Sequence, residues 1–508
     1  MELANLWIAV LLAWSATAQT APDSAGKAGE HVAVAATTVQ VYPGPGVDTY
    51  QSRLYSVEVL DGANWLSSYV YRYARTSNTL WHWGASPTVN FTTFGTNGLT
   101  TVRVSRPTGV ISSVEVSPKS RNIPLQIADG QALLTLSQGD KAWITLNGDD
   151  ANPLFVFADH LKPAIPSGAT YFGPGVRDIA PATGNHYLAS NNETIYVDGG
   201  AWLRGNIDTR GKTNVRIIGP GVLSGDLWTS EMVQSSPEFN ELMEYAMVRG
   251  DWGASNAIVD GVTIVDSPTY NFYGGTHQAR NVKLLSPWYY STDGFQGVNS
   301  VDQSFAFVGD NVFFPIWAGI ANDNITVTNS FAGTTGNAVF CGGFWGNPAS
   351  GRYKSVVDNV DIKTYNSDAW VRFGSPLTPA VFQIWVDSGD SNHGYSNQTY
   401  RNIRVEGDLL APLAMLKNMS YPWGPPHLLP PLGNSYNLVF SNVSLAGTQK
   451  HISEIKGLDA NNGFHNVQFH NLKMGGTDVS PANFNNYFAV NNYVSGLSFR
   501  TAAHGDRK

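Results

Sequence analysis

The phrase Asn402-Ile403-Arg404-Val405 recurs 40 residues later as Asn442-Val443-Ser444-Leu445, and this repeat decides the fold. It consists of Asn or Gly followed by an apolar-x-apolar triplet, and six further copies begin at Asn214, Gly261, Asn281, Asn324, Asn359 and Asn466. The intervals between copies include 20, 43, 43 and 40 residues, close to one or two multiples of about 21, a length typical of one β-solenoid coil. Because one coil cannot bury its apolar face alone, the repeat predicts a parallel β-helix.

The asparagine that opens most copies has a structural reason. Asn tolerates the left-handed backbone conformation of a tight turn and can hydrogen-bond the next coil. An ordinary β-sandwich with Asn-rich turns is the alternative, but eight copies of one phrase favour the solenoid. We therefore expect a right-handed parallel β-helix over residues 166–498 and a disordered tail at 499–508.

The N-terminal part of the chain follows a different pattern. Between about residues 39 and 158, apolar and polar residues alternate in short bursts, as in Leu54-Tyr55-Ser56-Val57-Glu58-Val59 and Ala142-Trp143-Ile144-Thr145-Leu146. A period of two with frequent turn signals predicts an antiparallel β-sandwich, which we place at 39–165. The predicted fold class is therefore all-β, with an N-terminal β-sandwich followed by the β-helix.

Composition limits the partners. The chain of 508 residues has a formal net charge of −8, which argues against nucleic acid or an anionic membrane surface as partner. Cys341 is the single cysteine, so neither an intrachain disulfide nor a cysteine-based metal site is expected. Zinc-type histidine spacing and phosphate-binding glycine loops are also missing from the sequence, and we expect no metal or cofactor. The predicted partner is a polysaccharide or oligosaccharide bound by a monomer.

The first residues resemble a secretory leader. An apolar run at residues 6–14 precedes Ala16-Thr17-Ala18, a small-x-small cleavage site, and is too short to span a bilayer. We predict a signal peptide at 1–18, a disordered linker at 19–38 and an extracellular protein. Six Asn-x-Ser/Thr sequons agree with a secreted glycoprotein: Asn90, Asn192, Asn324, Asn397, Asn418 and Asn442.

Candidate chemistry gathers where aromatic and acidic residues meet. Asp293 and Asp310 lie 17 residues apart, close to one coil, so they should stack on neighbouring coils. Inverting glycoside hydrolysis needs such a pair, one carboxylic acid at the leaving oxygen and one carboxylate that activates water. The alternative is that both are turn residues, because Asp-Gly and Gly-Asp-Asn are common turn sequences. The residues predicted to bind sugar beside them are Trp288, Tyr289, Tyr290, Phe295 and Asn311.

Two other groups are weaker candidates. Trp81-His82-Trp83 could stack on sugar, although aromatic packing within a sandwich is the favoured interpretation. Asp387 and Asp390 are interpreted as loop residues at the rim of the open groove that long β-helices commonly present along one sheet.

At these residues the chain resembles glycoside hydrolase family 49, the dextranases and isopullulanase. The resemblance runs over most of the chain and implies a pectin-lyase-like solenoid behind the sandwich. Its most specific signal is three motifs in order, Phe172-Gly173-Pro174-Gly175-Val176, Asp198-Gly199-Gly200-Ala201-Trp202-Leu203-Arg204-Gly205 and Gly219-Pro220-Gly221-Val222-Leu223-Ser224-Gly225. Two further motifs follow in the expected order, Ser267-Pro268-Thr269-Tyr270-Asn271 and Thr292-Asp293-Gly294.

The resemblance also implies roles. The family uses one aspartate in a Thr-Asp-Gly motif and an adjacent Asp-Asp pair about a coil later. By this match Asp310 is the general acid and Asp293 a water-activating base, while Asn311 replaces the second aspartate of the pair. An amide can hold a water but cannot take its proton, so the base machinery is reduced. The family's lysines are also replaced here, by Val312-Phe313-Phe314-Pro315-Ile316 and Ser286-Pro287-Trp288-Tyr289.

Three functions follow as hypotheses. The first is a secreted, inverting endo-glycosidase that hydrolyses an α-glucan, dextran-like or pullulan-like, or a related neutral polysaccharide. The second is a family member that has lost hydrolysis and binds glycan, or that catalyses non-hydrolytic chemistry on a small molecule. The third is a polysaccharide lyase on the same fold, for which the sequence offers neither a calcium site nor a lysine or arginine base.

Overall fold

The computed structural model describes residues 37–75, 87–229, 243–251, 255–275, 277–288, 292–314, 324–342, 354–365, 380–386, 395–418 and 433–501. Residues 37–508 form one compact unit. The predicted signal peptide lies outside the described residues, as do Trp81-His82-Trp83, Tyr289, Tyr290, Asp387 and Asp390.

The N-terminal strands form two facing sheets with a shared apolar core. The first sheet has the order β1 (Val39–Val41), β5 (Val89–Thr96), β11 (Leu154–Asp159), β10 (Lys141–Leu146) and β7 (Val114–Ser117), with β4 (Tyr71–Tyr73) also paired to β5. The second has the order β3 (Asn64–Ser68), β2 (Ser56–Asp61), β6 (Thr100–Ser105), β9 (Gln131–Leu136) and β8 (Leu125–Ala128). The predicted antiparallel pairing is wrong for one pair: β11 runs parallel to β5, because it is joined to β10 by a hairpin and reaches β5 from the other side.

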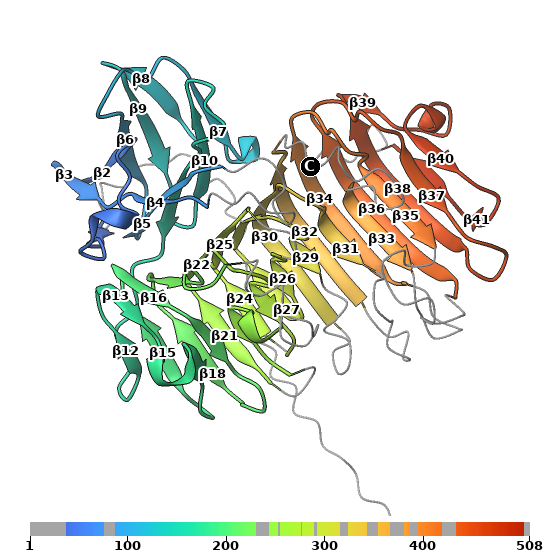
Figure 1. Ribbon diagram of the computed structural model, residues 1–508. Helices are drawn as coiled ribbons and strands as arrows, with labels where there is room; N and C mark the ends of the chain where they lie inside the picture. Colours follow the sequence, from blue (N-terminus) through green and yellow to red (C-terminus); the bar gives the residue numbers. More distant parts are fainter. Residues whose placement is uncertain are drawn as a thin grey trace, which may run out of the picture. The chain divides into compact units, whose positions relative to one another are not determined.

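The rest of the chain winds into stacked coils that share two long sheets, and the colours of Figure 1 follow this stack in sequence order. In the 20-stranded sheet, early coils contribute two short strands each: β12 (Thr170–Phe172), β13 (Gly175–Asp178), β15 (Thr194–Val197), β16 (Ala201–Arg204), β18 (Val215–Ile218), β19 (Val222–Ser224), β21 (Ala257–Asp260), β22 (Thr263–Val265), β24 (His277–Arg280), β25 (Lys283–Ser286), β27 (Val298–Asp302) and β28 (Phe305–Val308). Later coils contribute longer strands, followed by short ones at the end: β30 (Asn324–Thr334), β32 (Lys354–Lys363), β34 (Gln398–Glu406), β36 (Ser435–Leu445), β38 (Phe464–Met474), β39 (Thr477–Asp478), β41 (Val494–Ser495) and β42 (Ser498–Arg500).

The second long sheet has 11 strands, and each belongs to one coil. They are β14 (His186–Leu188), β17 (Asn206–Asp208), β20 (Val248–Arg249), β23 (Phe272–Tyr273), β26 (Phe295–Gln296), β29 (Phe313–Phe314), β31 (Ala338–Gly342), β33 (Ala380–Val386), β35 (Ala414–Asn418), β37 (Ser453–Lys456) and β40 (Phe488–Val490). Neighbouring strands of this sheet pair in parallel. The predicted fold class, a β-sandwich followed by a parallel β-helix, is confirmed.

The asparagines of the repeat behave as expected. Asn402 and Asn442 have φ angles of 55° and 53°, in the left-handed region. The Asn442 side chain donates to Oδ1 of Asn402 at 3.0 Å, and Asn471 donates to Asn442 at 2.9 Å. The predicted hydrogen bonds between coils are therefore confirmed.

The expected coil length is wrong for the later coils. The intervals of 43 residues from Asn359 to Asn402 and of 40 from Asn402 to Asn442 are each one coil, because β32 pairs directly with β34 and β34 with β36. In the sequence the additional residues fall between the described strands, before and after β33 in the first interval and β35 in the second. The predicted tail also starts too early, since β42 reaches Arg500 and Phe499 is buried against Phe469.

Five phenylalanines stack through the interior of the β-helix. They come from consecutive strands of the 11-stranded sheet: Phe272, Phe295, Phe313, Phe340 and Phe382. Ring centroids of successive pairs lie 5.5, 5.6, 5.4 and 5.2 Å apart. This ladder holds neighbouring coils in register, because shifting one coil would break both of its ring contacts.

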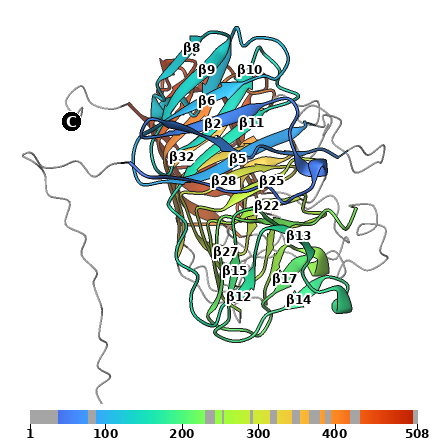
Figure 2. The same cartoon turned by 90° about the vertical axis from the view of Figure 1, so that its left-hand side faces the viewer.

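The sandwich packs directly on strands β22, β25 and β28 of the β-helix (Figure 2). Trp143 and Phe155 of the sandwich share an aromatic cluster with Phe305 and Phe307 of β28. A buried ion pair joins Lys283 Nζ to Asp159 Oδ2 at 2.5 Å. The sandwich thus covers the strands that lead into the Asp293 and Asp310 turns.

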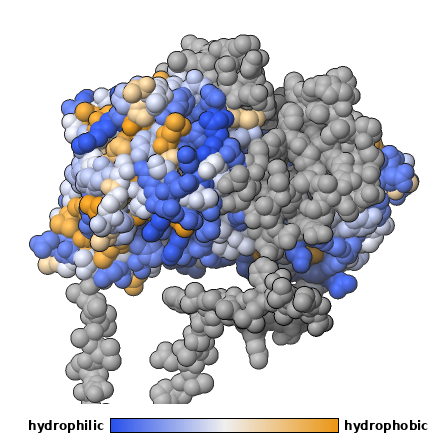
Figure 3. All heavy atoms as spheres, turned by 90° about the horizontal axis from the view of Figure 1, so that it is seen from below, coloured by the Kyte–Doolittle hydropathy of each residue, from blue (hydrophilic) through white to orange (hydrophobic). Residues whose placement is uncertain are grey.

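On the face that Figure 3 shows, much of the described surface is polar, with hydrophobic residues in small groups. Within the described residues no helix is long and apolar enough to cross a membrane. Two sequons have buried asparagines: Asn90 is fully buried and bonded to Ser52, and Asn418 is 4% exposed. These two sites cannot carry a glycan in the folded protein.

Candidate active site

Asp293 and Asp310 lie in equivalent turns of neighbouring coils. Each turn leads from the 20-stranded to the 11-stranded sheet, the first between β25 and β26 and the second between β28 and β29. The pairing of Phe295 with Phe313 fixes the register of the two turns. The predicted placement on neighbouring coils is therefore confirmed.

The register differs from the expected stacking by one residue. Counting back from the Phe295–Phe313 pair places Asn311 opposite Asp293, and the backbone N–H of Gly294 donates to the Asn311 carbonyl at 2.7 Å. The Asn311 side-chain amide donates to Asp293 Oδ1 at 2.8 Å. Asp310 lies one position earlier. All three side chains are nearly buried, with Asp293 5%, Asp310 4% and Asn311 8% exposed.

Burial and charge together shift the acidity of this pair. Burial, reinforced by the neighbouring Asp310 carboxylate, raises the pKa of Asp293 well above its ordinary value, while the Asn311 amide opposes the rise. Two carboxyl groups at close range in a dry site do not both ionise readily. The pair therefore keeps a proton at a pH where an exposed aspartate has lost its own. One protonated and one ionised carboxyl is the state that acid–base chemistry requires.

The backbone at both aspartates is clamped by buried side chains from flanking coils. Asn271, on the preceding coil, donates through its side-chain amide and its backbone N–H to the Asp293 carbonyl, each at 2.9 Å. Thr334, on the following coil, donates its hydroxyl to the Asp310 carbonyl at 2.7 Å. Both clamping residues are buried, at 0% and 1% exposed. The backbone carbonyl of each aspartate is thus fixed by a residue on a coil other than those of the pair.

Thr292 joins the two turns to each other. Its hydroxyl donates to the Ser286 carbonyl at 2.9 Å and accepts the backbone N–H of Gly309 at 3.0 Å. Gly309 directly precedes Asp310, and Thr292 directly precedes Asp293. One hydroxyl therefore links the residues that lead into both carboxylates.

Two of the predicted sugar-binding aromatics lie elsewhere. Trp288 is fully buried against the sandwich, and its indole N–H donates to the Pro87 carbonyl at 2.9 Å. Phe295 is 2% exposed and belongs to the phenylalanine ladder inside the coils. The prediction that these two bind sugar is wrong, because neither ring presents a face to solvent. Asn311 lies at the site beside Asp293, and its contact with sugar stays a prediction.

The clamping residues were not identified from the sequence. Asn271 stands out in the sequence only as the last residue of a family motif, and no motif contains Thr334 or Thr335. The Thr335 hydroxyl donates to the Pro287 carbonyl at 2.6 Å. Together the two threonines therefore hold the backbone of the Asp293 turn at Pro287 and that of the other turn at Asp310. Their position gives a signal: Thr334 ends β30 and Thr335 follows it, at the turn of the next coil that is equivalent to the Asp310 turn. Among the residues that the structure describes, no group of three or more His, Cys, Asp or Glu could hold a metal ion.

Comparisons with known proteins agree on the fold. No protein-family profile and no curated protein sequence matches the chain. Among solved structures, Dex49A from Penicillium minioluteum matches with a TM-score of 0.67 and 17% identity, covering 91% of this chain and 96% of that one. The polygalacturonase from Erwinia carotovora ssp. carotovora reaches a TM-score of 0.35 at 11% identity, covering 62% of this chain and 85% of that one, too low to support an inference. The chain therefore shares its two-part fold with Dex49A over nearly its whole length.

Proposed function

We propose that this protein is a secreted, inverting endo-glycosidase that hydrolyses an α-glucan or a related neutral polysaccharide. The observation that carries the proposal is the Asp293–Asp310 pair on neighbouring coils, where burial, together with the Asp310 charge, raises the pKa of Asp293. The fold shared with Dex49A and the resemblance to glycoside hydrolase family 49 point to the same chemistry.

In this mechanism Asp310 is the general acid and Asp293 the general base. The Asp310 carboxylic acid donates its proton to the glycosidic oxygen as the bond to the anomeric carbon breaks. Asp293, as carboxylate, takes a proton from a water that attacks the anomeric carbon from the opposite face. Solvent then returns a proton to Asp310 and removes one from Asp293. The acid role of Asp310 rests on the resemblance to the family, because the raised pKa of Asp293 by itself favours Asp293 as the group that holds the proton of the pair.

One observation favours a second candidate, a glycan-binding protein without hydrolysis. The Asn311 amide already donates to Asp293 Oδ1, the carboxylate expected to activate water. An amide at the place of a second carboxylate cannot accept a proton. If the single base is not enough, the same site would bind a glycan chain without cleaving it.

A hydrolysis assay separates these candidates. The purified chain is incubated with dextran, pullulan and polygalacturonate, and reducing ends and the anomeric proton are followed by NMR. We expect cleavage of an α-glucan with inversion, and loss of that cleavage in Asp310→Asn. Binding of a glucan without any new reducing ends would support the second candidate, and unsaturated uronate products would support a lyase instead.

We also propose secretion, which rests on the apolar run and the Ala16-Thr17-Ala18 site. N-terminal sequencing of protein from the culture medium should begin at Gln19. A chain that stays inside the cell with Met1 in place would contradict this part of the proposal.

A further inference from the structure

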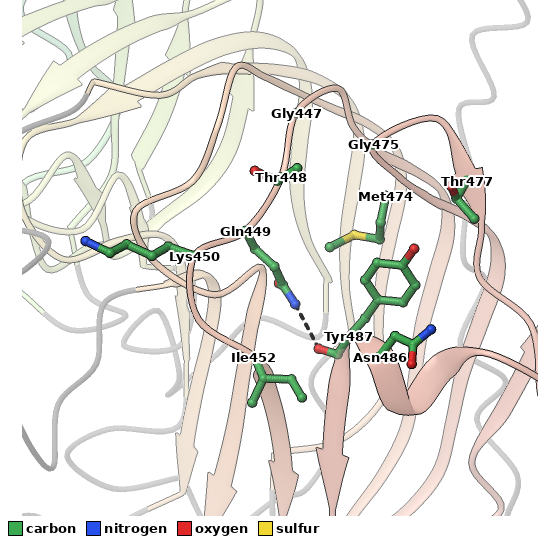
Figure 4. A pocket seen from close by; sticks show the side chains of 10 residues that line it. All are labelled: Gly447, Thr448, Gln449, Lys450, Ile452, Met474, Gly475, Thr477, Asn486 and Tyr487. Carbon is green, nitrogen blue, oxygen red and sulfur yellow. Dashed lines mark hydrogen bonds between the residues drawn. The ribbon is translucent and has the colours of Figure 1, made fainter.

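A pocket lies on the same row of turns as Asp310, further along the β-helix (Figure 4). Its lining comes from the turn between β36 and β37 and the turn between β38 and β40. Both turns lead from the 20-stranded to the 11-stranded sheet, as the Asp310 turn does. In the 11-stranded sheet β37 is four strands beyond β29, so the pocket is roughly 19 Å along the stack from the catalytic pair. We call it the distal pocket.

The distal pocket combines one aromatic ring with hydroxyl and amide groups. It has a volume of about 470 Å³, and the Tyr487 ring stands between Met474 and Asn486 (Figure 4). Ile452, which is 44% exposed, adds apolar surface. Polar groups come from Thr448, Thr477 and Asn486. A ring face with hydroxyls and amides around it suits a sugar, which has apolar C–H faces and an equatorial rim of hydroxyls.

The charge of the pocket lining limits the class of ligand further. No carboxylate is among the described residues that line the pocket, and the side chain of Lys450 extends away from the Tyr487 ring (Figure 4). The lining beside the ring is therefore neutral, while the Asp408 carboxylate, which is outside the lining, accepts the Thr448 N–H at 2.7 Å and the Thr448 hydroxyl at 3.0 Å. This favours a neutral saccharide over a cationic ligand or a polyuronate.

The floor of the pocket is rigid. Gln449 accepts the Leu413 N–H and the Ser453 hydroxyl, each at 2.9 Å, and donates its side-chain amide to the Tyr487 carbonyl at 2.8 Å. The Ser453 N–H donates to the same carbonyl at 2.9 Å. Because the Tyr487 backbone is fixed from the neighbouring coil, little conformational entropy is lost when the ring meets a ligand.

We propose that the distal pocket is an accessory binding site for the neutral glucan polymer, in line with the catalytic pair. This inference rests on the proposed function for the identity of the polymer. A chain bound at both places gains affinity because the second contact is intramolecular. A saccharide too short to reach both places gains nothing from the pocket.

The test compares binding and cleavage of long and short substrates. Binding of dextran and pullulan is measured by affinity electrophoresis of the full chain in an Asp310→Asn background, so that the polymer stays intact. Tyr487→Ala should weaken retention by about 2- to 10-fold, the range that one aromatic contact gives. The double variant Thr477→Ala/Asn486→Ala, which removes exposed side chains, should weaken it without a risk to folding. Tyr487→Phe keeps the ring and should restore most of the retention.

Tyr436→Ala is the matched control, since Tyr436 is 41% exposed on β36 and lies outside the pocket. In the active chain, the ratio of kcat/KM on polymer to that on a trisaccharide should fall in the pocket variants and stay constant in the control. If both pocket variants bind and cleave polymer like the parent, the inference is overturned while the proposed function stands. If the parent cleaves no glucan but its retention falls in both pocket variants, the inference stands and hydrolysis fails. A parent that binds no neutral glucan overturns both.

Discussion

The side-chain amide of Asn311 donates a hydrogen bond to Oδ1 of Asp293 across two neighbouring coils, at 2.8 Å. Two consequences follow from this contact. The amide favours the ionised form of Asp293 and so opposes the rise in its pKa that burial and Asp310 cause. It also occupies one carboxylate oxygen, so only the other oxygen is free of this amide and able to receive a proton from water.

Asn311→Leu should move the acidic limb of the pH–rate profile to higher pH. Without the amide donor the pKa of Asp293 rises further, and the base is protonated over a wider range. The profile of kcat/KM on dextran measures the shift. The control is Asn311→Gln, whose longer side chain keeps an amide donor. An acidic limb that is identical in Asn311→Leu and the parent would show that Asp293 is not the base.

Loss of either carboxylate should remove most activity and leave the fold intact. Asp310→Asn and Asp293→Asn are each expected to lower kcat by about 10²- to 10⁴-fold, the usual contribution of a general acid or base. Because each removes a partly charged group from a buried site, neither should lower the thermal unfolding temperature. Reducing-end assays and circular dichroism check both statements. Near-parental kcat in Asp310→Asn would disprove its assignment as the acid.

Thr292 should act as a positioning residue. Thr292→Val keeps the side-chain shape but leaves the Gly309 N–H without its acceptor, so the Asp310 turn loses its link to the Asp293 turn. We expect kcat to fall by about 10- to 100-fold with little change in KM, because small misplacements of catalytic groups are costly. Thr292→Ser, which keeps the hydroxyl, should restore most of the rate. Equal kinetics in the Val and Ser variants would contradict a positioning role.

The architecture was predictable because its signal is repeated many times. Each coil needs an inward apolar triplet and most need an asparagine at the turn, so the pattern appears in the sequence eight times over. Coil length was not predictable in the same way. A coil such as that from Asn359 to Asn402 can take up about 20 extra residues between its strands without changing how those strands pair. The spacing of two copies therefore does not show whether one coil or two separate them.

The site was predictable only in part. The spacing of Asp293 and Asp310 is constrained by the stack and survives in the structure, whereas the direction of each aromatic side chain is set by contacts distant in sequence. Trp288 meets Pro87 from the sandwich, 201 residues away, and no local pattern contains that information. The same holds for Asn271 and Thr334, whose partners lie on other coils.

Asp266 should make folding stability fall as pH rises from about 4 to about 6. It is fully buried, and burial raises its pKa to about 6 even though Arg75 and Tyr73 both donate to it. Since the folded-state pKa exceeds the unfolded value, the folded state binds the extra proton in this window, and up to about 3 kcal/mol is lost as that proton leaves. Urea unfolding at pH 4, 5, 6 and 7 measures the slope. In Asp266→Asn this falling component should be absent, and an unchanged slope would contradict the assignment.

His277 should have the opposite effect in an overlapping window. Its ring is fully buried, neither nitrogen has a hydrogen-bond partner among the described residues, and burial lowers its pKa to about 4. Here the unfolded state binds the extra proton, so the stability contribution present above pH 6.5 is lost as pH falls towards about 4, by up to about 3 kcal/mol. Because Asp266 and His277 act in opposite directions and other carboxyl groups also titrate in this range, each variant is compared with the parent. Between pH 4 and 6 the stability of His277→Leu should fall more steeply, or rise less, with pH than that of the parent, while the exposed His451→Leu should keep the parental profile. A His277→Leu slope equal to the parent's would mean that the buried imidazole is not the group that titrates.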